Sequence, residues 1–355
     1  MPVNIAQHVH LLKGKKVTIG FDGFIDSIVR VVTNRTPDRV DYFKTIREFG
    51  HYTIEKSGGN FSLELQQVVK KAGGNMPLMA RAMAGWDLHI NCIGTLGLPD
   101  VDPLFREFPD NCKLFSFANP GITTALEFSD GKIIMGEMTS LNSVDWKTVS
   151  RIVGTPKLRE LFSGSKLIGI VNWSELLHAT SIWKGLLENI VPFVSFDDKP
   201  VAFFDLADFS KRTAEDIKGA LDTLNLFKQY FRVVLGLNHN EARLLHEVIM
   251  GIPADNQLAE TGRKIYMDLR PEILLIHHKN TALAWHQGQA FIEECDIIDN
   301  PVISTGAGDN FNAGFALAMM MNLNITDCLK LAHQFASHYM RTGISLTVAE
   351  ALRTN

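Results

Sequence analysis

A run of small residues near the end of the chain finishes on a carboxylate and could bind phosphate. It reads Ser-Thr-Gly-Ala-Gly-Asp over residues 304–309, and apolar residues at helical spacing follow it as far as Met321. Glycine lets the backbone approach a ligand closely, and the first amides of a helix lack internal partners and attract phosphate. Asp309 could take a proton from a hydroxyl beside that phosphate. The run therefore suits a phosphoryl-transfer site, although Asp309 could also simply cap the helix.

Two more carboxylates follow the first apolar run of the chain. Residues 17–21 predict a buried strand, and Asp22 and Asp26 come after it. Ligands of open α/β sheets bind at the carboxyl ends of the strands, so both side chains could bind a polar substrate. Asp-Gly is also a common turn pair, and turn chemistry is an equally good interpretation from these residues alone.

Two short polar motifs each open a predicted helix. Gly-Gly-Asn at 73–75 precedes a helix over 76–86, and by itself this motif would be interpreted as a loop. Asn-x-x-Glu at 238–241 opens a helix that ends near Met250. The second motif fits a capping box as well as it fits a ligand site.

Taken together and in this order, the motifs resemble those of the ribokinase-like family, also called the PfkB carbohydrate kinases. Thr-Gly-Ala-Gly-Asp-x-Phe-x-x-Gly at 305–314 is similar to the family's second signature, and Gly-Gly-Asn with Ala80 is similar to its first. The resemblance spans essentially the whole chain. It implies an ATP-dependent carbohydrate kinase that phosphorylates a hydroxyl of a small polyhydroxylated substrate, with a sugar as the favoured acceptor.

The resemblance also implies a role for each motif residue. Asp309 would be the general base, and the amides of Gly306, Ala307 and Gly308 would form the anion hole. Glu241 would hold Mg²⁺ through water. The implied nucleotide- and phosphate-binding residues are Thr305, Asn238 and Glu241. The implied acceptor-binding residues are Asp26, Asp22, Gly73, Gly74 and Asn75.

Some positions depart from the family pattern. Leu78 stands where an Asn is usual, and Ile303 stands where an Asp usually begins the second signature. His278 and Thr281 stand near positions where glycines usually line the nucleotide site. These departures leave open a non-catalytic sugar- or nucleotide-binding protein, against which the retained Asp309 argues. A nucleoside or sugar-phosphate kinase is also open, and nothing in the sequence supports a monovalent cation.

A third function class fits the glycines poorly. The spacing around residues 306–314 does not match Gly-x-Gly-x-x-Gly, and it lies far from any first βαβ unit. A nicotinamide oxidoreductase is therefore disfavoured.

The remaining pattern predicts an α/β fold. Apolar runs at 167–171, 201–204 and 233–237 alternate with helical segments at 179–191 and 213–229, as in a doubly wound, mostly parallel sheet flanked by helices. The resemblance adds a small β-sheet lid, built from segments inserted at about 27–71 and 119–140 of one ribokinase-like domain over 1–355. The lid expectation includes a strand at 27–32, a helix over 38–49, strands at 51–55 and 61–65, and a hairpin around Asp130-Gly131.

Composition limits the partners. The 355 residues carry a net charge of −4 with no basic patch, which disfavours nucleic acid. No run of about 18 apolar residues occurs, which predicts no membrane span. Four well-separated cysteines and no signal peptide predict a cytoplasmic protein without a zinc site or disulfide frame. Because sheet edges seek partners, exposed lid strands predict a homodimer.

Overall fold

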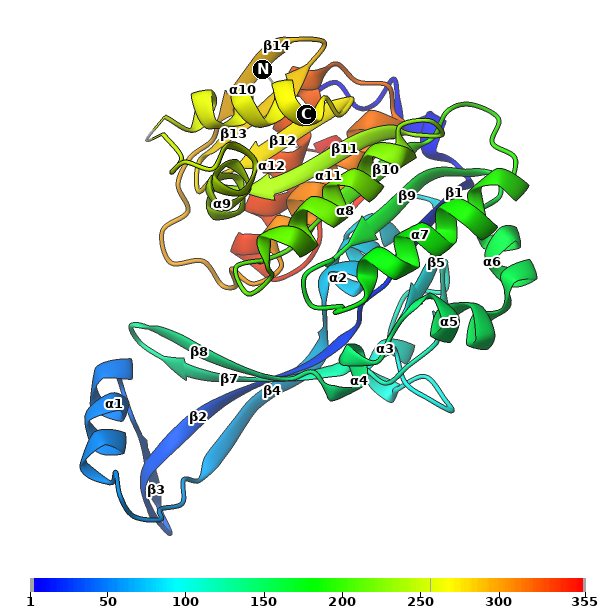
Figure 1. The fold of residues 1–355 in the computed structure, drawn as a ribbon. Coiled ribbons are helices and arrows are strands. Elements are labelled where there is room, and N and C mark those ends of the chain that lie inside the picture. The colour runs from blue at the N-terminus through cyan, green and yellow to red at the C-terminus, as the bar shows by residue number, and fades with distance from the viewer. Residues whose placement is uncertain (1–2, 256, 354–355) are drawn as a thin grey trace.

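The computed structural model describes residues 3–255 and 257–353 and contains two β-sheets of different kinds (Figure 1). The main sheet consists of β1 (Lys15–Gly20), β5 (Leu88–Gly94), β6 (Cys112–Ser116), β9 (Ser165–Val171), β10 (Val201–Asp205), β11 (Arg232–Asn238), β12 (Ile273–His277), β13 (Thr281–His286) and β14 (Gln289–Glu294). Their order across the sheet is β14-β13-β12-β11-β10-β9-β1-β5-β6. Neighbours pair in parallel except β12 with β13 and β13 with β14.

Two layers of helices cover the main sheet. Because successive residues of a strand point to opposite faces, Val201 and Phe203 of β10 contact one layer, and Ala202 and Phe204 contact the other. The first layer contains η1 (Val9–Leu12), α2 (Asn75–Ala84), α3 (Pro103–Arg106), α11 (Ala307–Met320), α12 (Ile325–Thr342) and α13 (Val348–Arg353). The second contains α4 (Thr139–Asn142), α5 (Trp146–Val149), η2 (Ser150–Gly154), α6 (Thr155–Phe162), α7 (Ala179–Asn189), η3 (Val191–Phe193), α8 (Ala214–Phe227), α9 (His239–Met250) and α10 (Leu258–Leu269). The predicted doubly wound α/β fold is confirmed.

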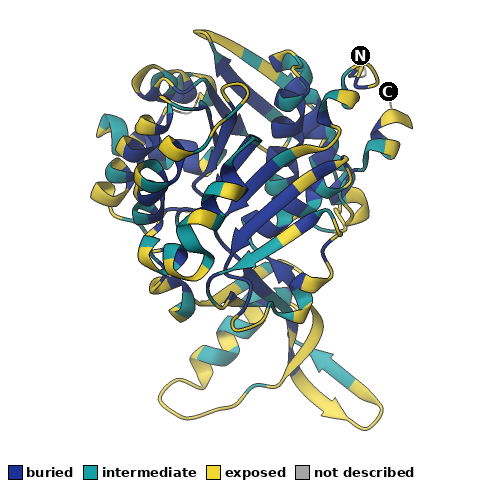
Figure 2. Ribbon diagram, turned by 90° about the vertical axis from the view of Figure 1, so that its right-hand side faces the viewer, coloured by how far each residue is buried: buried dark blue, intermediate teal, exposed yellow. Residues whose placement is uncertain are grey.

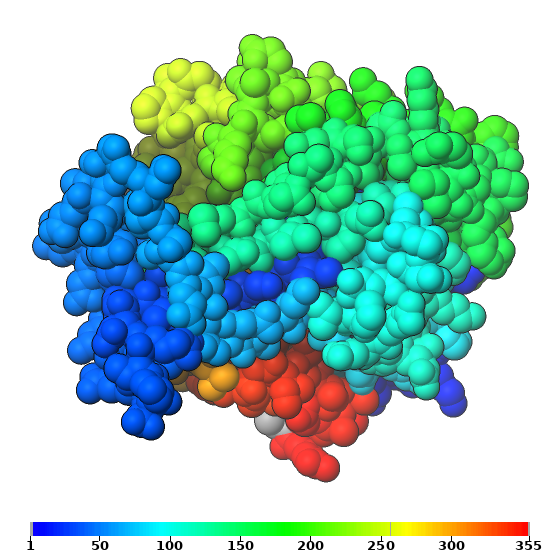
Figure 3. Space-filling view, turned by 90° about the horizontal axis from the view of Figure 1, so that it is seen from below, coloured from blue at the N-terminus to red at the C-terminus, as the bar shows by residue number. Residues whose placement is uncertain are grey.

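The first layer brings distant parts of the chain together. Helix α2 packs against α11, and α11 packs along α12. In the view from below, sky-blue residues of the first quarter of the chain lie against red residues near its end (Figure 3). This packing sets the Gly-Gly-Asn motif beside the Thr-Gly-Ala-Gly-Asp motif, although more than 200 residues separate them.

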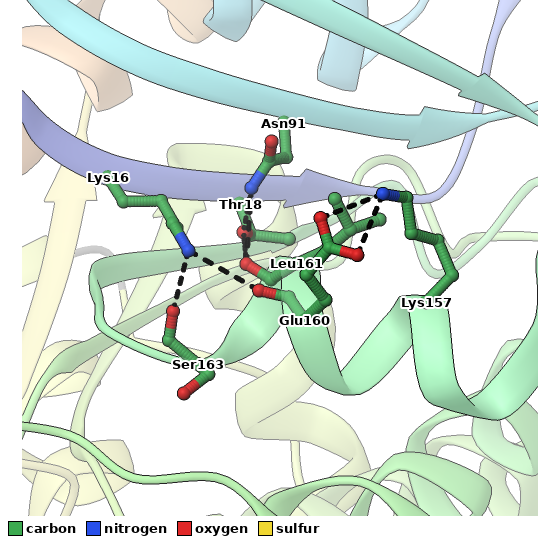
Figure 4. Close-up of polar contacts among 7 residues, drawn as sticks. All are labelled: Lys16, Thr18, Asn91, Lys157, Glu160, Leu161 and Ser163. Atoms are coloured by element: carbon green, nitrogen blue, oxygen red, sulfur yellow. Dashed lines mark hydrogen bonds and ion pairs between the residues drawn. The ribbon is translucent and has the colours of Figure 1, made fainter.

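At the amino ends of the strands, side chains from β1 and β5 hold the end of α6 (Figure 4). The last carbonyls of a helix have no partner inside the helix. Lys16 Nζ donates to the Ser163 carbonyl at 2.9 Å, and Thr18 Oγ1 donates to the Leu161 carbonyl at 2.8 Å. Asn91 Nδ2 also donates to Leu161 at 3.1 Å. This polar network therefore caps a helix, and it lies at the opposite end of the strands from Asp22 and Asp205.

The second sheet extends from the body as an arm (Figure 1). It is built from β2 (Phe24–Thr36), β3 (Arg39–Tyr42), β4 (Leu65–Gly73), β7 (Gly121–Phe128) and β8 (Gly131–Glu137), in the order β3-β2-β7-β8 with β4 also paired to β2. Helix α1 (Ile46–Glu55) packs on one face over a small apolar cluster that includes Val29 and Leu126. Most of the arm is exposed, in contrast to the body (Figure 2).

The predicted elements at the far end of the arm were wrong. A helix was expected over 38–49 and strands at 51–55 and 61–65, but residues 39–42 form β3, 46–55 form α1 and β4 starts at Leu65. A capping box begins α1, because Thr45 Oγ1 accepts the Glu48 amide and the Glu48 carboxylate accepts the Thr45 amide. The alternating apolar and polar residues of 51–55 also fit the spacing of a helix. Packing against the arm selects the helix over the expected strand.

Within residues 3–255 and 257–353, no helix combines the length and the apolar character that crossing a membrane requires.

Candidate active site

Four carboxylates meet at the carboxyl edge of the main sheet. Asp22 follows β1, Asp205 ends β10, and Glu241 and Asp309 lie in the first turns of α9 and α11. They are close enough that Asp205, Asp22 and Glu241 each raise the pKa of Asp309. Sequence reasoning missed Asp205, although a carboxylate directly after the apolar run 201–204 carries the same signal as Asp22.

Asp309 has the properties of a proton acceptor. Helix α11 begins at Ala307 after Gly306, whose φ of 95° suits glycine. Burial, followed by the charges of Asp205 and Asp22, raises the pKa of Asp309 well above its usual range. Apart from its own amide, no described residue hydrogen-bonds the half-buried carboxylate. Its oxygens are therefore available to a ligand.

Two of the three amides predicted for the anion hole are unpaired. The Ala307 amide donates to the Ser304 carbonyl at 3.1 Å, which closes the turn before α11. The amides of Gly306 and Gly308 have no hydrogen-bond partner in the described chain. These amides lie at the positive end of the α11 dipole, next to Asp309. The turn thus offers an anion the two free N–H groups of Gly306 and Gly308. The Ala307 N–H is already bonded to Ser304.

Asp26 lies on β2, at the junction of the arm and the body. Its Oδ1 accepts a hydrogen bond from Thr123 Oγ1 on β7 at 2.6 Å. Lys71 lies opposite Asp26 on β4, where burial lowers the pKa of the ammonium and Asp26 partly offsets this. A Cβ added to Gly73 would overlap the Asp26 carboxylate. The Asp26 carboxylate therefore occupies space that is open only because residue 73 is a glycine.

Asp22 is held inside the protein. It is 0% exposed, and its carboxylate accepts the amides of Asn75 and Met76 at 2.8 Å and Asn172 Nδ2 at 2.7 Å. Burial is the largest cause that raises its pKa, to about 6. Gly74, with φ of 99°, makes this approach feasible, since its Cβ would lie 2.6 Å from Asp22 Oδ2. The geometry supports a role in positioning the start of α2, and direct substrate contact by Asp22 stays a prediction.

Asp205 links the two motif-bearing helices of the first layer. Its Oδ2 accepts Asn312 Nδ2 of α11 at 2.7 Å and lies 3.5 Å from Asn75 Nδ2 at the start of α2. Its Oδ1 accepts the Ala207 amide at 2.7 Å. Asp205 therefore fixes the start of α2, which carries Asn75, relative to α11, which carries Asp309.

The Asn-x-x-Glu motif forms the predicted capping box. Asn238 Oδ1 accepts the Glu241 amide at 3.0 Å, and Glu241 Oε2 accepts the Asn238 amide at 2.8 Å. Glu241 is 8% exposed, and burial followed by the charge of Asp205 raises its pKa to about 8. The capping interpretation is confirmed, and contact with nucleotide or metal stays a prediction.

The carboxylates also suit a hard cation. Mg²⁺ prefers oxygen ligands and usually keeps several waters. Among the described residues, no group of three or more His, Cys, Asp or Glu side chains has metal-binding geometry. Asp205 and Glu241 could hold such an ion in part, with water and donor phosphates completing its coordination.

A cleft of about 640 Å³ adjoins Gly308, one of the two residues with a free amide. Its polar wall includes Asn238, His239 and His277, and its apolar wall includes Ile298 and Met340. The half-buried His277 ring packs on Phe311 at 5.0 Å, and burial lowers its pKa to about 4, so it is neutral near pH 7. The exposed His278 instead lies 4.6 Å from His239, ring centroid to ring centroid. Ser304 lines the cleft, whereas the neighbouring Thr305 is exposed.

Known proteins similar to this chain identify its family. The profile described as "Prokaryotic ketohexokinase" matches residues 6–354. A ketohexokinase of Haloferax volcanii is 29% identical over 353 residues, which cover 95% of this chain and 90% of that protein. The chain belongs to the prokaryotic ketohexokinase family, and it is a carbohydrate kinase with the ribokinase-like fold. The resemblance inferred from the motifs is thereby confirmed.

Solved structures support the fold. A ribokinase from Thermotoga maritima has a TM-score of 0.64 at 14% identity and covers 96% of this chain and 98% of its own. An adenosine kinase from Sinorhizobium meliloti has a TM-score of 0.65 at 13% identity, over 97% and 100%. An Arabidopsis thaliana ribokinase complexed with ribose and ATP has a TM-score of 0.61 at 17% identity, over 96% and 98%. At these identities the likeness shows the fold alone.

The contact between Gly73 and Asp26 generates a prediction about sugar binding. Gly73→Ala should displace the Asp26 carboxylate and raise the KM for the sugar about tenfold or more, because small displacements of positioning groups are costly. Steady-state kinetics and a thermal unfolding curve would measure both effects.

Gly219→Ala is the matched control, since Gly219 lies in α8 with no atom within 4 Å of an added Cβ. We expect unchanged kinetics and slightly higher stability from it. A normal sugar KM in folded Gly73→Ala would show that Asp26 does not need its observed position.

Proposed function

We propose that the protein transfers the terminal phosphoryl group of ATP to a hydroxyl of a ketohexose, with Asp309 as the general base. The observation that carries this proposal is the unpaired Asp309 carboxylate, of raised pKa, in the same helical turn as the free Gly306 and Gly308 amides. The acceptor class is supported by the family and by the ketohexokinase of Haloferax volcanii.

The reaction then divides among residues of this chain. Asp26 and Asn75 orient the sugar through its hydroxyls, and Asp309 accepts the proton of the attacking hydroxyl as the new O–P bond forms. The bond between the transferred phosphorus and ADP breaks. The amides of Gly306 and Gly308, with that of Ala307, stabilise the charge on the phosphoryl oxygens. Such transfer depends mainly on positioning and electrostatics.

The donor and its metal fit the remaining features. The 640 Å³ cleft opens beside Gly308 and has an apolar wall suited to the adenine base of ATP. Thr305, Asn238 and Glu241 would lie along the phosphates, and Glu241, through water, with Asp205 would hold Mg²⁺. When bound, Mg²⁺ supplies the positive charge that lets a triphosphate approach four carboxylates.

The arm would serve as a lid within one ribokinase-like unit over residues 1–355. Asp26 on β2 and Thr123 on β7 lie where the arm joins the body, so the lid strands carry part of the sugar site. Closure over the sugar would exclude water, which otherwise competes as acceptor.

Asp309→Asn tests the base. We expect turnover to fall by about 10² to 10⁴-fold, because the amide cannot accept the proton, while sugar binding persists. ADP release should be measured with a ketohexose, an aldohexose, a ketohexose phosphate and a nucleoside.

Asp327→Asn is the matched control, since Asp327 lies in the first turn of α12 and away from the carboxylate cluster. We expect it to behave as the wild type. Equal activity of Asp309→Asn and the wild type would rule out the base assignment, and tight sugar binding without any turnover would favour the non-catalytic alternative.

The raised pKa of Asp309 generates a second prediction. Asp309 acts as a carboxylate, whose population falls as the pH drops through its pKa. Because that pKa is raised, kcat/KM should decline on the acid side at a higher pH than an ordinary aspartate, of pKa about 3.9, would give. The residual activity of Asp309→Asn should lack this limb. An acid limb at the ordinary carboxylate position would contradict the assignment.

The lid also supports a homodimer. Both β4 and β8 are edge strands and carry the exposed apolar residues Leu65, Val68, Val69, Ile134 and Met135. Edge strands of this kind invite pairing with another chain. Light scattering should give a dimer for the wild type and a monomer for a Val69→Lys, Ile134→Lys double variant. Leu226→Lys, on exposed α8, is the control. A monomeric wild type at assay concentrations would end this proposal.

A further inference from the structure

We propose that Tyr339 of α12 positions the anion hole by holding the peptide group that carries the Gly306 amide. The inference rests on the proposed function, since it concerns how that site orients the backbone N–H groups of its anion hole. Tyr339 belongs to neither signature and lies on the core face of α12.

The first observation is one hydrogen bond. Tyr339 Oη donates to the Thr305 carbonyl oxygen at 3.2 Å. Within the described residues, no other donor reaches that carbonyl. The Thr305 carbonyl and the Gly306 N–H belong to the same peptide group, which is planar and trans, so the two bonds point in opposite directions. A donor that fixes the carbonyl therefore fixes the direction of the free N–H.

The second observation is close packing on the same turn. A Cβ added to Gly306 would lie 3.0 Å from Tyr339 Oη and 3.2 Å from Leu78 Cδ1. The turn is thus confined between α12 and α2, and Gly306 with φ of 95° fits that space. Leu78, which departs from the Asn that the family resemblance leads one to expect, here supplies an apolar wall against the turn.

The third observation is the setting of the phenol. Tyr339 is 6% exposed, and burial, followed by the charge of Asp309, raises its pKa. The hydroxyl therefore stays protonated, as a donor must, under conditions where Asp309 is ionised. The charge of Asp26 also raises this pKa, with a smaller effect than that of Asp309. Its own carbonyl accepts the Gly343 amide at 2.8 Å, which anchors the end of α12.

Tyr339→Phe removes the hydroxyl and keeps the ring. We expect kcat to fall about tenfold, less than the 10²–10³ loss typical when an oxyanion donor is deleted, because the Gly306 amide remains but is no longer held. The sugar KM should stay within about twofold, since the Asp26 side is untouched. Tyr339→Leu, which also removes the packing, should lower kcat further.

Tyr266→Phe is the matched control. Tyr266 Oη accepts the Gly288 amide at 3.3 Å, so this variant also loses a tyrosine–backbone hydrogen bond, but far from the anion hole. We expect an unchanged kcat. Melting temperatures of all three variants would separate positioning from stability, because a merely structural role would lower the melting temperature and leave kcat of the folded enzyme unchanged.

The outcomes separate this inference from the proposed function. An active wild type with wild-type kcat in folded Tyr339→Phe overturns the inference and leaves the kinase mechanism standing. A raised sugar KM with unchanged kcat also overturns it, because Tyr339 would then serve the acceptor. Absence of turnover by the wild type on every acceptor overturns the proposed function and this inference with it.

Discussion

The site depends on how four carboxylates can coexist next to the proposed phosphate-binding turn. Two unit charges about 4 Å apart repel by about 4 kcal/mol at an effective dielectric constant of about 20. Hydrogen bonds to three of the four carboxylates offset part of this repulsion. Asp22 and Asp205 accept hydrogen bonds from backbone amides and Asn side chains, and Glu241 takes part in a capping box. Among the described residues, Asp309 has no such partner besides its own amide, so in the proposed mechanism its oxygens remain available to the reacting hydroxyl.

The helix that carries Asp309 belongs to the tightly packed body, whereas the arm is mostly exposed. Helix α11 is buried along nearly its whole length after the first turn, and α2 and α12 pack against it. The turn that starts α11 therefore cannot shift without disturbing the core. The arm buries little and holds Asp26 only where its strands enter the body. Moving parts are expected in the region with few buried contacts, and that region is the arm.

Sequence reasoning predicted what local pattern encodes. The apolar runs of the main sheet, the capping box at 238–241 and the glycine-rich start of α11 were predicted from spacing alone. The outer arm was predicted wrongly, because its short amphipathic segments satisfy two periods and only packing selects one. Asp205 was missed although it follows an apolar run as Asp22 does, because it belongs to none of the motifs from which the site was predicted. Tyr339 was missed because its contact with Thr305 joins residues 34 positions apart.

The departures from the family pattern gain a physical meaning from these contacts. If Leu78 had simply lost a polar role, its side chain would face an open sugar site. It instead packs on the Gly306 turn opposite Tyr339, so two helices that meet only in the folded protein confine the same peptide groups. His277, at the end of β12, stays neutral near pH 7 and lies close to Gly308, so it adds no charge to the cleft. Both side chains therefore pack beside the turn that carries the unpaired amides, and neither adds a charge next to them.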